Sequence, residues 1–132
     1  MPADLIDLLV AEHRRLESLF ADVETARTSD GREAALGAAL AALERHSLAE
    51  ERFLHPALRE YLPAGPEIAA YEDAEHASFR RQAGDRAAGL FDAARQHMQE
   101  EETELFPRLA QACPARELRR LGDLLESVRV TE

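Results

Sequence analysis

The chain has 132 residues, of which 45% are hydrophobic and 32% charged, and its formal net charge is −10. This size and composition predict one domain with a modest core, and the acidic balance without a basic stripe argues against nucleic acid or an anionic membrane surface as partners. The single cysteine, Cys113, excludes an intramolecular disulfide and a cysteine-based zinc site, and no apolar stretch approaches membrane-spanning length.

The first predicted helix covers about residues 4–26, with Asp4 as its N-cap and Asp7 three residues later. These two aspartates also interrupt the first apolar run, and no basic region precedes it. We therefore expect no secretory signal and a cytoplasmic location. One face of this helix is apolar except for a single histidine: Leu5, Leu9, His13, Leu16, Phe20 and Val23.

The second predicted helix covers about residues 32–61, after a break at residues 28–31. Ser29 or Asp30 is its expected N-cap, and Pro56 should kink it. Its apolar face contains one histidine and one glutamate: Leu36, Ala39, Leu43, His46, Glu50, Leu54 and Leu58. A proline- and glycine-rich segment at residues 62–66 is the clearest break in the chain.

A third helix is predicted to begin near Pro66, where proline suits the first turn. It carries Ile68, Tyr71, Glu72, His76 and Phe79, and the fourth helix carries Leu90, Ala94, His97, Glu101 and Leu105. The turn between them is marked only by glycines near residues 84–89. An antiparallel hairpin is predicted, and the alternative is one unbroken helix in a bundle completed by a second chain.

A short amphipathic helix is predicted over about residues 115–129, following Cys113 and Pro114. It should pack its apolar face on the rest of the fold through Leu118, Leu121, Leu125 and Val128. Because short loops make neighbouring helices antiparallel, the fold predicted is all-α: an up-down-up-down four-helix bundle over about residues 4–110 with a short C-terminal helix. The whole chain, residues 1–132, is expected to form a single domain.

Each half of the bundle repeats the same chemical pattern. Residues 46–51 read His-Ser-Leu-Ala-Glu-Glu and residues 97–102 read His-Met-Gln-Glu-Glu-Glu, while His13 and His76 each end an Ala-Glu-His triplet. A histidine and a glutamate four residues apart lie on the same side of a helix. Carboxylates on a buried face are costly unless cations neutralise them. The pattern therefore predicts a metal site with six candidate ligands: His13, His46, Glu50, His76, His97 and Glu101.

Imidazole and carboxylate ligands suit iron, manganese or zinc. Six ligands, two of them carboxylates, fit two metals better than one, since both glutamates can bridge metals about 3.5–4 Å apart. Ferritin-like bundles use Glu-x-x-His, which this chain lacks, so a ferroxidase of that class is disfavoured.

Over about residues 4–110, this pattern resembles the hemerythrin-like (HHE cation-binding) domain. The resemblance implies two non-haem iron ions with an oxo or hydroxo bridge, with manganese or zinc as alternatives. His13 and His46 would hold one iron, His76 and His97 the other, and Glu50 and Glu101 would bridge them. It also implies binding or sensing of O2 or NO, or iron handling, in a metal- and gas-binding protein more than an enzyme.

The chain departs from the oxygen-carrying members of that family. They have a fifth histidine one turn before the position of His76, where this chain has Glu72, and their second carboxylate falls at the position of Glu102. The set here is closer to the iron–sulfur-cluster repair branch, although that branch has an additional N-terminal cysteine-containing segment. These departures favour redox reaction or sensing over reversible O2 carriage.

Several residues near the predicted ligands have alternative interpretations. Glu72 is either an additional ligand, an acceptor for an imidazole N–H, or a solvated side chain. His55 is a weaker metal candidate, and the second glutamate of each repeat is expected to form surface ion pairs. Tyr61 and Tyr71 are expected to pack in the core, and Cys113 is expected to be a plain buried thiol.

Two rival functions remain open at this point. The first is a di-iron oxidoreductase that reduces peroxide or NO, or a protein that donates iron for iron–sulfur cluster repair. The second is a metal-free helical interaction module.

Overall fold

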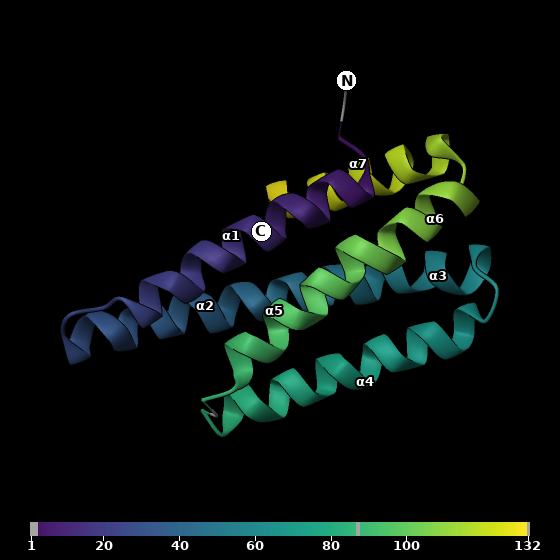
Figure 1. The fold of residues 1–132 in the computed structure, drawn as a ribbon. Coiled ribbons are helices and arrows are strands. Elements are labelled where there is room, and N and C mark those ends of the chain that lie inside the picture. Colours follow the sequence, from purple (N-terminus) through teal and green to yellow (C-terminus); the bar gives the residue numbers. More distant parts are fainter. Residues whose placement is uncertain (1–2, 87, 132) are drawn as a thin grey trace.

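The chain folds into a bundle of antiparallel helices (Figure 1). The computed structural model describes residues 3–86 and 88–131, and no β-strand occurs in this part of the chain. The helical segments, with two π-helical turns labelled η, are α1 (Leu5–Glu24), α2 (Ser29–Ala49), η1 (Glu50–Leu54), α3 (His55–Tyr61), α4 (Gly65–Gly84), α5 (Leu90–Glu100), η2 (Glu101–Leu105), α6 (Phe106–Ala112) and α7 (Ala115–Thr131).

The topology is up-down-up-down, with α7 returning beside α1 (Figure 1). α2, η1 and α3 form one long helix, and α5, η2 and α6 form another. The predicted all-α bundle with a short C-terminal helix is confirmed. Because α4 ends at Gly84 and α5 begins at Leu90 beside it, the alternative of one unbroken helix is wrong.

The helix N-termini follow the local sequence, with one correction. The side chain of Asp4 accepts a hydrogen bond from the Asp7 amide and Asp7 accepts one from the Asp4 amide, so the predicted capping box is confirmed. The second helix begins at Ser29, three residues earlier than predicted. Its N-cap is Thr28, whose hydroxyl accepts a hydrogen bond from the amide of Gly31 at 3.0 Å.

The kink predicted at Pro56 takes the form of a π-helical turn. In η1 the amide of His55 donates to the carbonyl of Glu50, five residues earlier, and in η2 the amide of Phe106 donates to Glu101 in the same way. Each turn ends two residues before a proline, which lacks an amide hydrogen and would clash with the carbonyl four residues before it. The wider turn relieves that clash and changes which side chains face the bundle axis.

The bundle core has two apolar clusters at opposite ends. The α7 layer lies beneath α7 and includes Leu5, Leu9, Leu54, Leu58, Leu109, Leu118, Leu121 and Leu125. The loop layer lies toward the loops after α1 and α4 and includes Leu16, Phe20, Val23, Leu43, Phe79, Leu90 and Met98. Both layers contain side chains from all four helices of the bundle, counting partly buried Ile68 as the α4 member of the α7 layer.

The C-terminal helix closes the α7 layer, as the amphipathic pattern predicted. Leu118, Leu121 and Leu125 are buried, and Val128 is partly buried against the same cluster. α7 approaches the start of α1 so closely that a Cβ at Gly122 would lie 2.8 Å from the carbonyl oxygen of Ala3. Among the described residues, no helix combines the length and apolar character needed to cross a membrane.

Candidate metal centre

A layer of buried polar side chains separates the two apolar layers. We call it the polar layer, and its members come from all four helices of the bundle: His13, His46, Glu50, His55, Glu72, His76, His97 and Glu101. All six predicted ligands lie in this layer, each no more than 4% exposed. The structure therefore brings together residues that are up to 88 positions apart, from His13 to Glu101.

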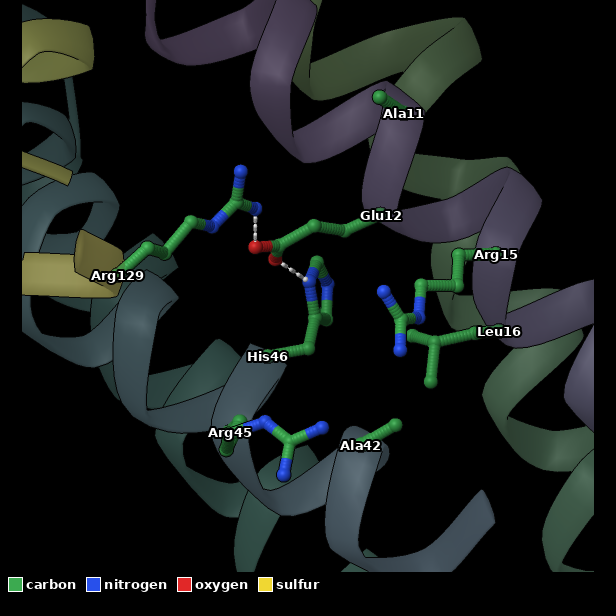
Figure 2. Close-up of a pocket in the computed structure, with 8 residues that line it drawn as sticks. All are labelled: Ala11, Glu12, Arg15, Leu16, Ala42, Arg45, His46 and Arg129. Atoms are coloured by element: carbon green, nitrogen blue, oxygen red, sulfur yellow. Dashed lines mark hydrogen bonds and ion pairs between the residues drawn. The ribbon is translucent and has the colours of Figure 1, made fainter. Parts of the chain in front are cut away.

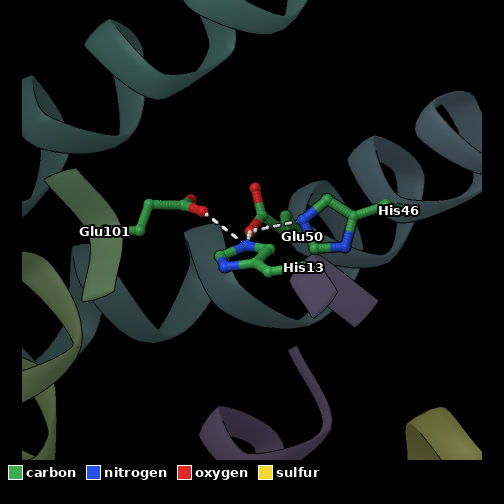
Figure 3. Close-up of side chains that lie close together, drawn as sticks. All are labelled: His13, His46, Glu50 and Glu101. Atoms are coloured by element: carbon green, nitrogen blue, oxygen red, sulfur yellow. Dashed lines mark ion pairs between the residues drawn. The ribbon is translucent and has the colours of Figure 1, made fainter. Parts of the chain in front are cut away.

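One half of the polar layer is shown in Figure 3, where two imidazoles lie beside two carboxylates. Nε2 of His13 is 3.1 Å from Oε1 of Glu101, and Nε2 of His46 is 3.1 Å from Oε2 of Glu50. One donor atom from each of these four residues lies within 4.8 Å of the others. This spacing is small enough for one cation to contact all four.

The other half of the layer has the same carboxylates and two more imidazoles. Nε2 of His76 is 3.0 Å from Oε1 of Glu50, and Nε2 of His97 is 3.3 Å from Oε2 of Glu101 and 3.6 Å from Oε1 of Glu72. The donor atoms form two overlapping clusters here, one of Glu50, His55 and His76 and one of Glu50, Glu72, His97 and Glu101. Glu50 belongs to every cluster, so it is the geometric centre of the layer.

The opposite nitrogen of most of these rings is held by a carboxylate farther out. The Nδ1–H groups donate to Glu102 from His13 at 2.7 Å, to Glu12 from His46 at 2.5 Å and to Glu51 from His76 at 2.7 Å. Nδ1 of His97 lies 3.6 Å from Glu75, which is too long for a hydrogen bond. This arrangement directs the Nε2 atoms of these three rings inward, as in the carboxylate–histidine–metal units of metalloproteins.

Arginines neutralise these outer carboxylates at the surface. Glu102 pairs with Arg14, Glu51 with Arg80, and Glu12 with Arg129. Figure 2 shows the third case, in which Glu12 lies between the Arg129 guanidinium and the His46 ring. A cavity of about 390 Å³ opens beside this pair and is also lined by Arg15 and Arg45.

The polar layer contains donors and acceptors that protein groups leave unsatisfied. Within the described part of the chain, nine buried side-chain nitrogen and oxygen atoms have no hydrogen-bond partner, and all nine belong to this layer: His13 Nε2, His46 Nε2, Glu50 Oε2, His55 Nε2, Glu72 Oε1, both ring nitrogens of His97 and both carboxylate oxygens of Glu101. Native proteins rarely bury such atoms without partners. Nitrogen and oxygen donors converging without hydrogen bonds fit a bound cation.

Burial and neighbouring charges also shift the pKa values of the ionisable groups in the layer. Burial raises the pKa of Glu101 well above its usual range, and the Glu50 charge raises it further. Burial acts against the ionised form of Glu50 as well, but the charge of His46 and the close approach of the His13, His46 and His76 rings hold its pKa well below the usual range. Burial also lowers the pKa of His97, but the nearby carboxylates outweigh it and raise that pKa to about 9. The pKa values of these two neighbouring carboxylates are therefore shifted in opposite directions.

Three other sequence-based interpretations are changed by the structure. The second glutamates, Glu51 and Glu102, form the predicted ion pairs with arginine but also hold imidazole rings. His55 was a weak candidate, yet it is fully buried within the layer. Tyr71 is 55% exposed, so its predicted core packing is wrong because it lies on the outer face of α4.

Two glutamates of the site, Glu12 and Glu75, were not predicted from the sequence. Glu12 and Glu75 are the glutamates of the two Ala-Glu-His triplets, and each lies beside the ring of the neighbouring helix, His46 or His97. The identical triplets were a signal that these glutamates have equivalent places. Glu72 is 5% exposed, which excludes a solvated side chain.

Comparison with known proteins gives one match. A family model described as the hemerythrin HHE cation binding domain matches residues 4–127, from the N-cap of α1 to the last turns of α7. No curated protein and no solved structure matches the chain.

Proposed function

The chain belongs to the hemerythrin HHE cation-binding family, and from this premise we propose that it is a non-haem di-iron protein that binds or senses O2 or NO. The observation that carries the proposal is the set of nine buried, unpartnered donor atoms in the polar layer. A layer of this kind inside an otherwise apolar bundle would be costly without cations. Bound metal ions would offset that cost by coordinating the unpartnered donor atoms.

The charges and donor types support two divalent ions. Glu50 and Glu101 together contribute two negative charges when both are ionised, and the surrounding imidazoles are neutral ligands. In our proposal His13 and His46 would hold one iron and His76 and His97 would hold the other, with Glu50 and Glu101 available to both. Nitrogen and oxygen donors without thiolate favour iron, manganese or zinc over soft metals.

Iron held there would supply a redox-active centre able to take a diatomic ligand. Residues of the chain exclude water from this centre and orient its imidazole rings. The α7 layer and the loop layer keep bulk water from both ends of the polar layer, and the outer carboxylates Glu12, Glu51 and Glu102 fix the imidazole rings with Nε2 inward. Leu16 and Ala42 line the cavity beside His46, giving a small ligand an approach to the layer.

Metal analysis of the protein tests this proposal directly. We expect about two irons per chain after anaerobic loading with Fe²⁺, and an absorption spectrum that changes on addition of O2 or NO. His46→Ala and Glu101→Ala should each lose iron, whereas Cys113→Ala, a buried substitution in the α7 layer, should retain it. Wild-type protein with well under one metal per chain after loading would reject the proposal. Catalytic consumption of peroxide or NO would instead assign the centre to an oxidoreductase.

A further inference from the structure

His55 lies in the polar layer with one ring nitrogen bonded and the other free. Its side chain is 0% exposed, and its Nδ1–H donates to Oδ1 of Asp73 at 2.7 Å. Its Nε2 is buried and has no hydrogen-bond partner. This is the same arrangement as in His13 and His46, whose Nδ1–H groups also donate to carboxylates and whose Nε2 atoms are also unpartnered.

The ring of His55 faces the shared carboxylate of the layer. Donor atoms of His55, Glu50 and His76 lie within 4.8 Å of one another, and the rings of His55 and His76 have centroids 5.1 Å apart. The π-helical turn η1 causes this placement. In a regular α-helix two residues five positions apart point about 140° away from each other, whereas the five-residue hydrogen bond of a π turn stacks Glu50 and His55 on one face.

Alignment of the two halves of the repeat shows that the pair of His55 and Asp73 has no second copy. With the two His-x3-Glu segments aligned, the counterpart of His55 is Phe106, which stacks against His13 at 5.8 Å. With His13 and His76 aligned, the counterparts of Glu72 and Asp73 are Leu9 and Val10. The three polar residues therefore come from both halves, His55 from the first and Glu72 and Asp73 from the second, and each has an apolar counterpart in the other half.

We propose that His55 is a fifth histidine ligand, bound through Nε2 to the metal on the His76 side and oriented by Asp73. This inference rests on the proposed di-iron function. A histidine that served packing alone would not need a carboxylate on Nδ1 and an unpartnered Nε2 facing Glu50. The two metal positions would then be unequal, since the His76 side would have an additional imidazole donor where the His13 side has Phe106. The side with fewer protein donors, near His13 and His46, is the one left open to a small ligand.

The inference is tested by counting imidazole ligands in the Fe²⁺-loaded protein. Each ligand histidine that retains its Nδ1–H gives one exchangeable, paramagnetically shifted proton resonance, which is absent in D2O. We expect five such resonances in the wild type and four in His55→Phe, which places the residue of the second repeat at this position. Iron affinity, measured by competition with a chelator, should fall roughly 10–100-fold for the weaker site in His55→Phe.

Two further variants separate ligation from a structural role. His55→Gly should regain iron and a shifted resonance when imidazole is added, which restores a ligand but not a covalent side chain. Leu54→Ala removes a fully buried neighbour in the α7 layer, so it should lower the melting temperature of the metal-free protein while leaving iron affinity unchanged.

The outcomes of the two proposals can be distinguished. If the wild type binds two irons but shows only four shifted resonances, and His55→Phe binds iron as tightly as the wild type, His55 is not a ligand and the di-iron proposal still stands. If the wild type itself does not load, the proposed function fails first. Unchanged iron binding by His55→Gly with and without imidazole would also overturn the role of His55.

Discussion

At the scale of single residues, the site depends on pairs of groups rather than on the predicted ligands alone. A hydrogen bond from Nδ1–H to a carboxylate fixes the ring tautomer and makes Nε2 a better metal donor. Glu51 does this for His76 at 2.7 Å and also contacts Arg80 at 2.9 Å. Glu44 contacts the same arginine at 3.0 Å but does not contact a histidine of the site.

This contrast gives a matched pair of substitutions. Glu51→Gln keeps the size of the side chain but weakens the acceptor for the His76 Nδ1–H, so we expect metal affinity to fall about 10–100-fold. Glu44→Gln alters the other carboxylate on Arg80 and should leave affinity unchanged. Chelator competition with both variants measures the effect. Equal losses in the two variants would mean that the Arg80 ion pairs, and not the His76 hydrogen bond, matter for binding.

Metal binding to the polar layer should depend on pH. The pKa of His97 is raised to about 9, so its ring carries a proton at pH 7, and the raised pKa of Glu101 favours its protonated form. Ligands must lose these protons to bind a cation. We expect about one proton released by His97 at pH 7, with a further contribution from Glu101, and tighter binding as pH rises from 6 to 8. A pH-indicator titration with Co²⁺ measures this release, and a pH-independent affinity would contradict it.

The reactivity of Cys113 follows from burial. The side chain is 3% exposed, and burial together with the charge of Glu117 raises the pKa of the thiol to about 11. Because the thiolate is the reactive form, alkylation of the native protein at pH 8 should be much slower than alkylation of the unfolded chain. Timed labelling with iodoacetamide in buffer and in denaturant compares the two. Equal rates would show that the end of α6 opens freely.

Sequence reasoning placed the candidate ligands of the polar layer better than it placed their partners. His13, His46, Glu50 and Glu101 lie on apolar helix faces, and periodicity is enough to place such residues inside. The inward position of His55 depends on the π turn, which an analysis at 100° per residue does not include. Tyr71 fell on the predicted face of α4 but is exposed, because one hydrophobic residue does not fix the rotation of a helix that buries Glu72 instead.

At the scale of helices, the two prolines and α7 affect the backbone and the packing next to the polar layer. Pro56 and Pro107 each follow a π turn that begins at the glutamate of the polar layer, so the same local distortion occurs once in each half. The sequence predicted a kink at Pro56 but not a π turn, since a kink and a π turn relieve the same clash. α7 seals the α7 layer, and its contact with α1 depends on Gly122.

Two glycine substitutions test that contact. Gly122→Ala would place a Cβ 2.8 Å from the Ala3 carbonyl oxygen, so we expect a loss of about 1–3 kcal/mol in the free energy of unfolding. Gly37→Ala lies on the exposed face of α2 with nothing within 4 Å of the new Cβ, and should instead stabilise by about 0.5–1 kcal/mol. Denaturant unfolding of the metal-free variants measures both. A neutral Gly122→Ala would mean that α7 is not closely docked.

At the scale of the whole molecule, the fold places a destabilising polar layer between two stabilising apolar ones. The α7 layer and the loop layer account for most of the large buried hydrophobic side chains of the described residues. The polar layer contributes buried charge and unpartnered atoms, which oppose folding unless a ligand compensates them. Metal binding and folding should therefore be linked, with the metal adding stability that the metal-free chain lacks.

Removal of the metal measures this linkage. A site filled at roughly 1,000 times its dissociation constant contributes about 4 kcal/mol, which for a domain of this size raises the melting temperature by about 15 °C. Calorimetry before and after chelation should show that difference in the wild type. Glu101→Leu removes a buried carboxylate and replaces it with an apolar side chain of similar volume, so it should lose the response to metal.

The same variant separates a functional cost from a structural one. A buried charge without a cation is less favourable than a well-packed apolar side chain, and the raised pKa of Glu101 shows how poorly its place accepts that charge. Metal-free Glu101→Leu should therefore melt at or above the temperature of the metal-free wild type. If it melts far below that temperature, Glu101 supports the fold through protein contacts. The buried carboxylate would then not reduce the stability of the metal-free protein, contrary to our expectation.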